Sequence, residues 1–312
     1  MDFSLSTSYF ARQELSPKQM AKVVRELGFT AVELGYFVCE MELDEWEKAL
    51  AAESLTVSSV HAFCPMSLEM PQLGPEIFSL AAQEEWERQA ACKALLRTLA
   101  CAVRFSARAV VIHGGRVELR EPRRFLLGSK YYHSRLEAAY CSCPETLDEA
   151  LIAYEQGLRK KQATVCRDAL IRSLTEILPH FESQGIALAF ENLPGLEAFP
   201  DPAELLDLRK QFPLSCLSAW YDIGHGERKQ RVGDWSIAET LRLTEAMTVG
   251  VHIHDVSGLR QDHCAPGEGS IDFKALVPLL SKPNLLRVFE PAPSVTREAL
   301  RKGLLQIQRM LA

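Results

Sequence analysis

The chain has 312 residues, of which 47% are apolar and 24% are charged. This composition is that of a folded globular protein, so it excludes disordered, collagen-like and coiled-coil classes, and the length suffices for one large domain or two ordinary ones. With 41 acidic against 35 basic residues the formal net charge is −6, which gives no electrostatic reason to bind a phosphate backbone. We therefore do not expect nucleic acid as a partner.

The nine cysteines are an odd number and are scattered along the chain. Only Cys141 and Cys143 lie close together, and one intervening residue is a poor match to the spacing of zinc ligands. We interpret the cysteines as reduced thiols of a cytoplasmic protein. The first residues lack a basic stretch followed by an apolar one, and no apolar run reaches the length of a membrane span. Neither export nor membrane insertion is expected.

Short β-branched or apolar runs alternate with longer segments of helical spacing along the whole chain. The predicted strands are 2–7, 29–34, 55–61, 108–113, 186–191, 217–222, 248–254 and 285–290. The predicted helices are about 16–27, 43–53, 76–105, 165–184, 202–211, 235–245, 272–281 and 295–311. The first strand carries no glycine-rich phosphate turn, which argues against an open doubly wound sheet. We therefore predict an α/β fold, a single (β/α)8 TIM barrel over residues 1–312.

The segment 116–164, after the fourth strand, is far longer than an ordinary connection between a strand and a helix. We expect an insertion with structure of its own, basic in its first half and with helical spacing over 145–161. One hypothesis is that its arginines recognise a phosphate or carboxylate on the substrate. These arginines are Arg116, Arg120, Arg123 and Arg124. The open alternative is a solvated or oligomer-forming segment, and hence a homo-oligomer.

Six titratable residues fall at or near the last position of separate predicted strands. They are His61, His113, Glu191, Asp222, His252 and Glu290. In a (β/α)8 barrel the carboxyl ends of all strands face one mouth, so we expect these side chains to share one space. A single His or Glu at a strand end is more often an ordinary hydrogen-bonding residue. Their joint placement is what indicates a functional site.

Four of these residues form a ligand set suited to a divalent metal. They are Glu191, Asp222, His252 and Glu290. Oxygen-rich ligation with one imidazole suits Mn, Co, Mg or Zn rather than a metal selected by thiolates. Three carboxylates this close would repel one another unless a dication neutralised them. We place His254 at the rim of the barrel, and we expect Asp255 to orient an imidazole.

Five short motifs follow the predicted strands 5 to 8. They are ENLPG (191–195), DIGH (222–225), HIHD (252–255), H-x3-GEG (263–269) and FEP (289–291). With these motifs, and over nearly its whole length, the chain resembles the xylose-isomerase-like TIM-barrel superfamily. That superfamily includes sugar isomerases and epimerases, inosose dehydratases and type-IV apurinic endonucleases. The segment 116–164 is the main departure from its pattern.

The resemblance implies that the four ligands named above hold the metal of the epimerase and isomerase members, and that His225 contacts the substrate. Four histidines also match histidines of the three-zinc site of the endonucleases. They are His61, His113, His225 and His263. The endonuclease pattern has an Asp two residues before the last of these histidines. This sequence departs from it there, with Gln261 at that position and Asp262 beside it.

Such a site predicts a metal-dependent isomerase or epimerase of a small sugar or sugar phosphate, with a role in carbohydrate metabolism. A divalent metal polarises the carbonyl of a hydroxyketone, acidifies the neighbouring C–H and stabilises the resulting enediolate. Glu191 and Glu290 approach from different strands, so one would remove the proton and the other would return it. The residues expected to bind substrate are His61, His113, His225, His263, Glu33 and Arg116. For Glu33 a salt bridge at the barrel rim is the alternative.

A metal-dependent phosphodiesterase resembling the apurinic endonucleases is the second hypothesis. The histidine-rich mouth and the local basic segment favour it, whereas the overall acidity and the displaced Asp262 speak against it. A third hypothesis is a binding protein without catalysis. One metal ion per chain would support the sugar enzyme, and three zinc ions would support the phosphodiesterase. The fold leaves the particular sugar open, because such barrels host many reactions.

Overall fold

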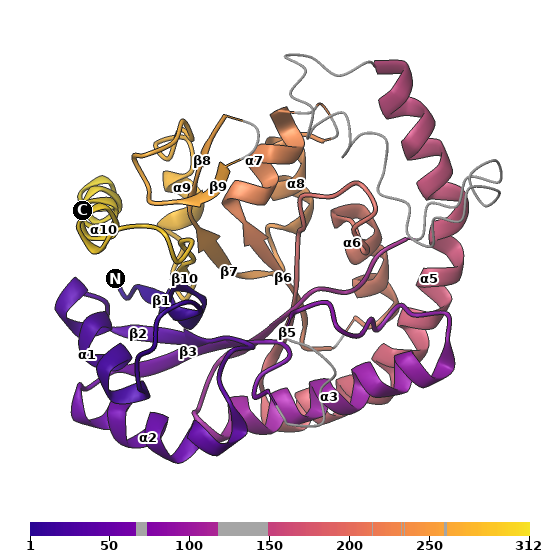
Figure 1. Ribbon diagram of the computed structural model, residues 1–312. Coiled ribbons are helices and arrows are strands. Elements are labelled where there is room, and N and C mark those ends of the chain that lie inside the picture. Colours follow the sequence, from indigo (N-terminus) through magenta and orange to yellow (C-terminus); the bar gives the residue numbers. More distant parts are fainter. Residues whose placement is uncertain (67–73, 118–148, 214, 232, 234, 259–260) are drawn as a thin grey trace.

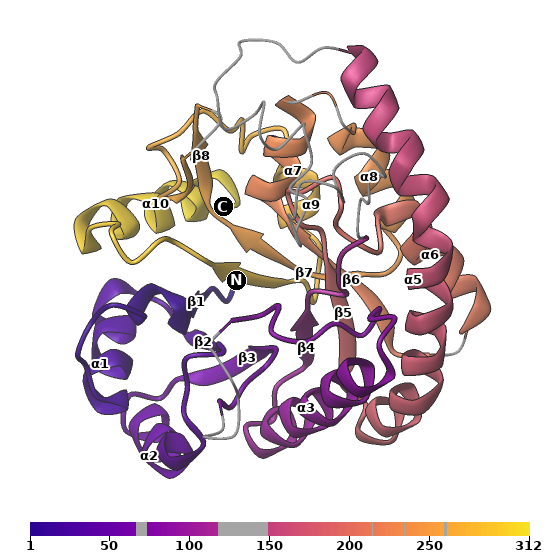
Figure 2. The same cartoon turned by 45° about the vertical axis from the view of Figure 1, so that its right-hand side comes forward.

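Eight parallel strands form a closed barrel in the order β1–β10–β7–β6–β5–β4–β3–β2 (Figures 1 and 2). The strands are β1 (Ser4–Ser6), β2 (Ala31–Leu34), β3 (Thr56–His61), β4 (Ala109–Ile112), β5 (Ala187–Glu191), β6 (Leu217–Asp222), β7 (Thr248–Ile253) and β10 (Leu286–Phe289). The structure, a computed structural model, describes residues 1–312 apart from 67–73, 118–148, 214, 232, 234 and 259–260. Each of the eight strands predicted from the sequence is present, and the predicted barrel fold is confirmed.

Helices surround the barrel (Figure 2). The α-helices are α1 (Pro17–Leu27), α2 (Leu43–Ala52), α3 (Glu85–Arg104), α5 (Glu149–Gln184), α6 (Pro202–Gln211), α7 (Ile223–Arg231), α8 (Ile237–Thr244), α9 (Val277–Leu280) and α10 (Arg297–Met310). The short 3-10 helices are η1 (Thr7–Phe10) and η2 (Glu40–Glu42), and β8 (Asp255–Ser257) pairs with β9 (Gln261–Cys264) as an antiparallel hairpin. In the described parts of the chain, no helix combines the length and the apolar character that a membrane span requires.

Helix α5 differs from the sequence prediction, because it is one helix from Glu149 to Gln184 rather than a helix that begins at 165. Residues 149–164 of the expected insertion are therefore the first turns of a helix that packs on the barrel (Figure 1). Arg159 anchors this part of the helix, since its buried guanidinium donates to the carbonyl oxygens of Leu196 and Ala198 at 2.8 and 2.7 Å. The rest of the expected insertion beyond residue 117, including Arg120, Arg123 and Arg124, lies outside the described residues.

Helix α7 and the β8–β9 hairpin were not predicted from the sequence. Two glycines lower the helix propensity of the segment that forms α7. The helix forms nevertheless, because Asp222 caps it by accepting the backbone N–H of His225 at 2.6 Å. Gly224 is required by packing, since a Cβ there would lie 2.0 Å from the ring of His254. A local cap by Asp222 and the tertiary packing of Gly224 against His254 therefore both accompany this helix.

A separate apolar cluster of strand residues forms a second core beside the larger one. Its buried members are Ala109, Val111, Ala189, Trp220, Leu286 and Val288. They alternate along their strands, which is the pattern of side chains that fill the interior of a barrel. The Trp220 ring lies 5.2 Å from the ring of His252 in an edge-on arrangement. Trp220 therefore packs inside the barrel against the ring of His252.

We predict that Gly250→Ala destabilises the protein by about 1–3 kcal/mol, the usual cost of overpacking a core. A Cβ at Gly250 would lie 2.1 Å from the Trp220 ring, so the ring or the strand must shift. The matched control is Gly157→Ala in α5, where an added Cβ meets nothing within 4 Å and the helix gains stability. Urea unfolding followed by circular dichroism measures both variants. A Gly250→Ala protein as stable as the wild type would contradict the packing described here.

Candidate active site

The carboxyl ends of the strands, called the mouth here, bring the four predicted metal ligands together. Glu191 ends β5, Asp222 ends β6, His252 lies near the end of β7, and Glu290 directly follows β10. One ligand atom from each of the four lies within 4.8 Å of those of the other three. These four residues are called the quartet below. Parallel strands in one barrel end at one face, which is why residues up to 99 positions apart converge.

The Nδ1 atom of His252 lies at the centre of the quartet. It is 3.4 Å from Glu191 Oε1, 3.4 Å from Glu290 Oε2 and 3.6 Å from Asp222 Oδ2. His252 is fully buried, and among the described residues this nitrogen has no hydrogen-bond partner. A buried nitrogen without a partner, facing three carboxylates, is a donor set that fits a divalent cation such as Mn, Co, Mg or Zn.

A second group of residues that could hold a cation, His61, His113 and Glu191, shares Glu191 with the quartet. Nε2 of His61 lies 3.1 Å, and Nε2 of His113 lies 3.4 Å, from Glu191 Oε2. The other ring nitrogen of each histidine has its own acceptor. His61 Nδ1 donates to the carbonyl oxygen of Ala62 at 2.9 Å, and His113 Nδ1 donates to Glu76 Oε1 at 3.3 Å. Both rings therefore turn Nε2 toward Glu191, an orientation in which imidazoles also ligate metals.

A third group consists of His225, His254 and His263, whose ligand atoms also lie within 4.8 Å of one another. His263 Nδ1 donates to the carbonyl oxygen of Glu290 at 2.8 Å. Both ring nitrogens of His254 have partners, since Nδ1 accepts the backbone N–H of His263 at 2.9 Å and Nε2 donates to Asp222 at 3.0 Å. The prediction that His254 lies at the rim is wrong. It is fully buried and holds the Asp222 carboxylate in place.

The expectation for Asp255 is also wrong, because its carboxylate orients a loop rather than an imidazole. It accepts the backbone N–H groups of Gly267, Gly269 and Ile271 at 2.9 to 3.0 Å. These residues belong to or follow the GEG motif, and the same loop carries His263 into the mouth. The buried Asp255 thus fixes the loop whose histidine contacts the backbone of Glu290.

Glu33, predicted to bind substrate, lies beneath the mouth. Its side chain is 0% exposed, and it accepts hydrogen bonds from Ser59 Oγ at 2.7 Å and from His252 Nε2 at 3.2 Å. The short strand β2 directs the side chain into the barrel interior, where it pairs with His252. The sequence places Glu33 at a strand end but gives no signal for its depth.

Arg116, predicted to bind an anionic group, has carboxylate partners of its own. Its guanidinium contacts Glu76 at 2.5 Å and Glu197 at 3.1 Å. Glu76, which we did not single out in the sequence, thus contacts both Arg116 and His113. It precedes α3 in a connecting segment, and no strand-end pattern marks it.

Asn192, the second residue of the ENLPG motif, joins two strands of the quartet. Its Nδ2 donates to the backbone carbonyl of Asp222 at 2.9 Å, and its Oδ1 accepts the backbone N–H of the same residue at 2.8 Å. The paired bonds fix the ends of β5 and β6 relative to each other. The distance between Glu191 and Asp222 is thereby set by the Glu-Asn sequence itself.

The charges of the mouth are strongly coupled. Burial lowers the pKa of His113 and of His225, but the neighbouring carboxylates outweigh it and raise both pKa values to about 9. Burial raises the pKa of Glu191 and of Asp222, yet the surrounding imidazoles hold both well below their ordinary values. Imidazolium groups therefore neutralise the carboxylates in the metal-free protein, and a bound cation would take over this task.

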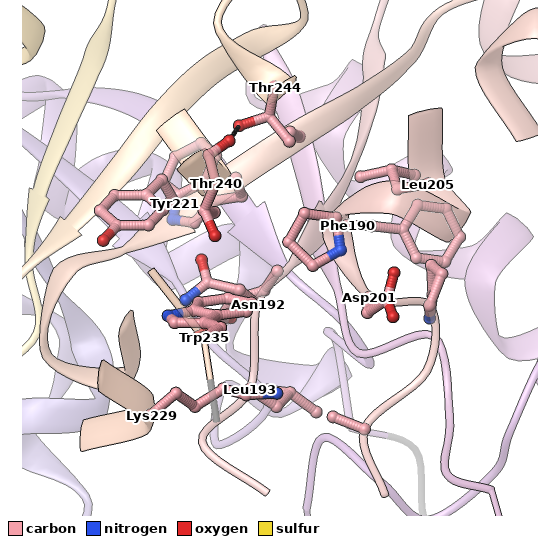
Figure 3. Close-up of a pocket in the computed structure, with 16 residues that line it drawn as sticks. Phe190, Asn192, Leu193, Asp201, Leu205, Tyr221, Lys229, Trp235, Thr240 and Thr244 are labelled. Carbon is pink, nitrogen blue, oxygen red and sulfur yellow. Dashed lines mark hydrogen bonds between the residues drawn. The ribbon is translucent and has the colours of Figure 1, made fainter. Parts of the chain in front are cut away.

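A further cavity lies behind the mouth, lined by residues of β5, β6, α6 and α8 (Figure 3). Some of its polar side chains are engaged locally, whereas the buried Tyr221 hydroxyl and Trp220 Nε1 have no hydrogen-bond partner among the described residues. Thr244 donates to the carbonyl oxygen of Thr240 at 3.0 Å, Trp235 donates to that of Gly226 at 3.1 Å, and the Lys229 ammonium lies 4.6 Å from the centre of the Trp235 ring. Most of the side chains that line it are apolar, so we interpret this cavity as part of the packing between helices and barrel.

Known structures share this architecture. The 3-keto-D-glucoside 4-epimerase YcjR from E. coli has a TM-score of 0.68 at 16% identity, with 99% of each chain covered. An AP endonuclease of family 2 from Brucella melitensis has a TM-score of 0.64 at 17% identity, again with 99% of each chain covered. At such identities the likeness shows the fold alone.

A relative in sequence is the protein MJ1311 of Methanocaldococcus jannaschii, 30% identical over 103 residues. The match covers 32% of this chain, and the chain spans about a third of the length of that relative, 34%. The model of one protein family, described as xylose isomerase-like TIM barrel, matches residues 21–304. The chain therefore belongs to the xylose isomerase-like TIM-barrel family.

Proposed function

We propose that the protein is a divalent-metal-dependent isomerase or epimerase of a small sugar. The observation that carries this proposal is the position of His252 Nδ1, which lacks a hydrogen-bond partner among the described residues and faces Glu191, Asp222 and Glu290. The activity of YcjR, a barrel of the same architecture, supports the choice of substrate class.

The quartet would hold the metal, which supplies polarisation of a substrate carbonyl when bound. Glu191 and Glu290 belong to strands on different sides of the His252 ring, so they can serve opposite faces of one carbon. One of the two side chains, as a carboxylate, would remove the proton next to the carbonyl and become a carboxylic acid. The other, as a carboxylic acid, would give its proton to the opposite face and become a carboxylate, which inverts the carbon. Return of the proton to the neighbouring carbon instead gives an isomer.

The exposed fraction of each side chain indicates how deep that side chain lies in the site. His252 and Asp222 are fully buried, Glu290 is 15% exposed and His263 is 28% exposed. The substrate therefore approaches from the side of His263, with His113 and His225 flanking Glu191. These histidines are placed to hydrogen-bond hydroxyl groups of a sugar, while the residues below them hold the metal.

We predict that Glu191→Gln and Glu290→Gln each lower the rate of proton exchange at the substrate carbon by about 10²- to 10⁴-fold, because each removes one acid or base. The measurement is deuterium incorporation into ketoses from D2O by the Mn²⁺-supplemented protein. The control is Glu182→Gln, an exposed carboxylate on α5, which should leave the rate unchanged. Wild-type rates retained by both mouth variants would contradict the mechanism.

The electrostatics of the mouth predict a pH dependence of stability in the absence of metal. Because folding raises the pKa of His113 and His225 to about 9, their contribution is present below pH 6.5 and is lost as the pH rises through 9. The lowered pKa values of Glu191 and Asp222 act oppositely, so their contribution is lost in acid below pH 4.5.

In calorimetry with EDTA we therefore expect Tm to fall by several degrees between pH 6.5 and pH 9. With Mn²⁺ in place of EDTA the fall should be smaller, since the cation neutralises the carboxylates without imidazolium protons. An EDTA profile that rises over this range would show that the imidazoles do not neutralise the mouth.

A metal-dependent phosphodiesterase is the second candidate, and the two further ligand groups beside the quartet favour it. Against it, both ring nitrogens of His254 already have partners within the protein, and Gln261 replaces an expected carboxylate. We predict one tightly bound ion per chain by metal analysis after dialysis. Three zinc ions together with cleavage of duplex DNA at an abasic site would favour the phosphodiesterase.

A further inference from the structure

We propose that Glu33 is a positioning residue that holds His252 in the tautomer able to bind a metal. This role rests on the proposed function, because it concerns the metal held by the quartet. Glu33 contacts Nε2 of His252 from below, at 3.2 and 3.4 Å from its two carboxylate oxygens, while Nδ1 faces the quartet above. Glu33 and His252 are both fully buried, so water does not compete for either nitrogen.

The two nitrogens of the His252 ring face carboxylates on opposite sides. On the upper side, Glu191, Asp222 and Glu290 attract a proton to Nδ1, and a proton there would occupy the lone pair that a cation needs. On the lower side, the Glu33 carboxylate attracts the proton to Nε2 and leaves Nδ1 free. A buried carboxylate behind a metal-binding imidazole is a known way to fix both tautomer and ring orientation.

Three serine hydroxyls form a chain of contacts that ends on the Glu33 carboxylate. Ser59 Oγ donates to Glu33 Oε2 at 2.7 Å, and Ser58 Oγ lies 3.3 Å from Ser59 Oγ. Ser4 Oγ in turn donates to Ser58 Oγ at 2.7 Å. These residues come from β1 and β3, the neighbours of β2 in the barrel. Ser59 thus contacts the Glu33 carboxylate directly, and the hydroxyls of Ser58 and Ser4 continue the chain of contacts from β3 to β1.

The first test measures Zn²⁺ affinity by calorimetric titration of the whole chain. Glu33→Gln keeps the shape of the side chain but removes the charge that holds the Nε2 proton, so we expect the dissociation constant to rise by about 10- to 100-fold. Ser59→Ala removes one bond to Glu33 and should give a smaller rise. Ser218→Ala is the matched control, since Ser218 is a buried serine that donates to the carbonyl oxygen of Cys216. It should bind Zn²⁺ as the wild type does.

The second test is the long-range ¹H–¹⁵N spectrum of the Zn²⁺-loaded wild type with labelled histidine, in which a His252→Asn sample identifies the His252 signals. We expect the His252 proton on Nε2 and the metal on Nδ1. The opposite pattern would overturn the proposal even if Glu33→Gln failed to fold.

The outcomes separate this role from the proposed function. If the wild type binds Zn²⁺ and folded Glu33→Gln binds it within twofold, the role of Glu33 is refuted while the metal site stands. If the wild type binds no Mn²⁺ or Zn²⁺, the metal-dependent function itself fails, and the role of Glu33 fails with it. Weaker binding by Glu33→Gln and Ser59→Ala, with Ser218→Ala unchanged, supports the proposal.

Discussion

The mouth of this barrel depends on one electrostatic constraint, the presence of buried carboxylates at the ends of neighbouring strands. Glu191 and Asp222 are almost completely excluded from water, and Glu290 lies beside them. Negative charges so placed must be neutralised, and the structure offers imidazoles for this purpose. The same arrangement that charges the imidazoles in the metal-free protein presents oxygen and nitrogen ligands to a divalent cation. The groups that balance the charge of this site are therefore also the groups that could hold a cation.

A shell of supporting residues fixes this arrangement from several directions. Asn192 clamps the ends of β5 and β6, His254 holds the Asp222 carboxylate, and Asp255 fixes the loop that carries His263. Each support uses a buried hydrogen bond, which is costly to leave unmade and therefore restricts the geometry. Glu33 belongs to the same shell, on the side of His252 away from the quartet. The geometry of this site therefore depends on residues around the quartet as well as on the quartet itself.

The family relationship concerns the fold, whereas the local geometry concerns the choice between two activities. Membership in the xylose isomerase-like family establishes the barrel and the place of the mouth. The choice between sugar chemistry and phosphodiester cleavage rests on how many cations the histidine groups hold, because both activities occur among barrels of this shape. Both ring nitrogens of His254 in the third group have partners within the protein, which is one reason for the proposal of a sugar enzyme.

The sequence alone determined the eight strands, the closed barrel and the convergence of Glu191, Asp222, His252 and Glu290, because strand periodicity and strand-end position are local properties. Only the tertiary structure decided the depth of Glu33, the burial of His254 and the partners of Arg116. These depend on which way a side chain leaves its strand and on neighbours distant in the chain, such as Ser59 and Glu76. It also decided the close approach of His254 to Gly224 in helix α7, where a local cap by Asp222 offsets the weak helix propensity of two glycines.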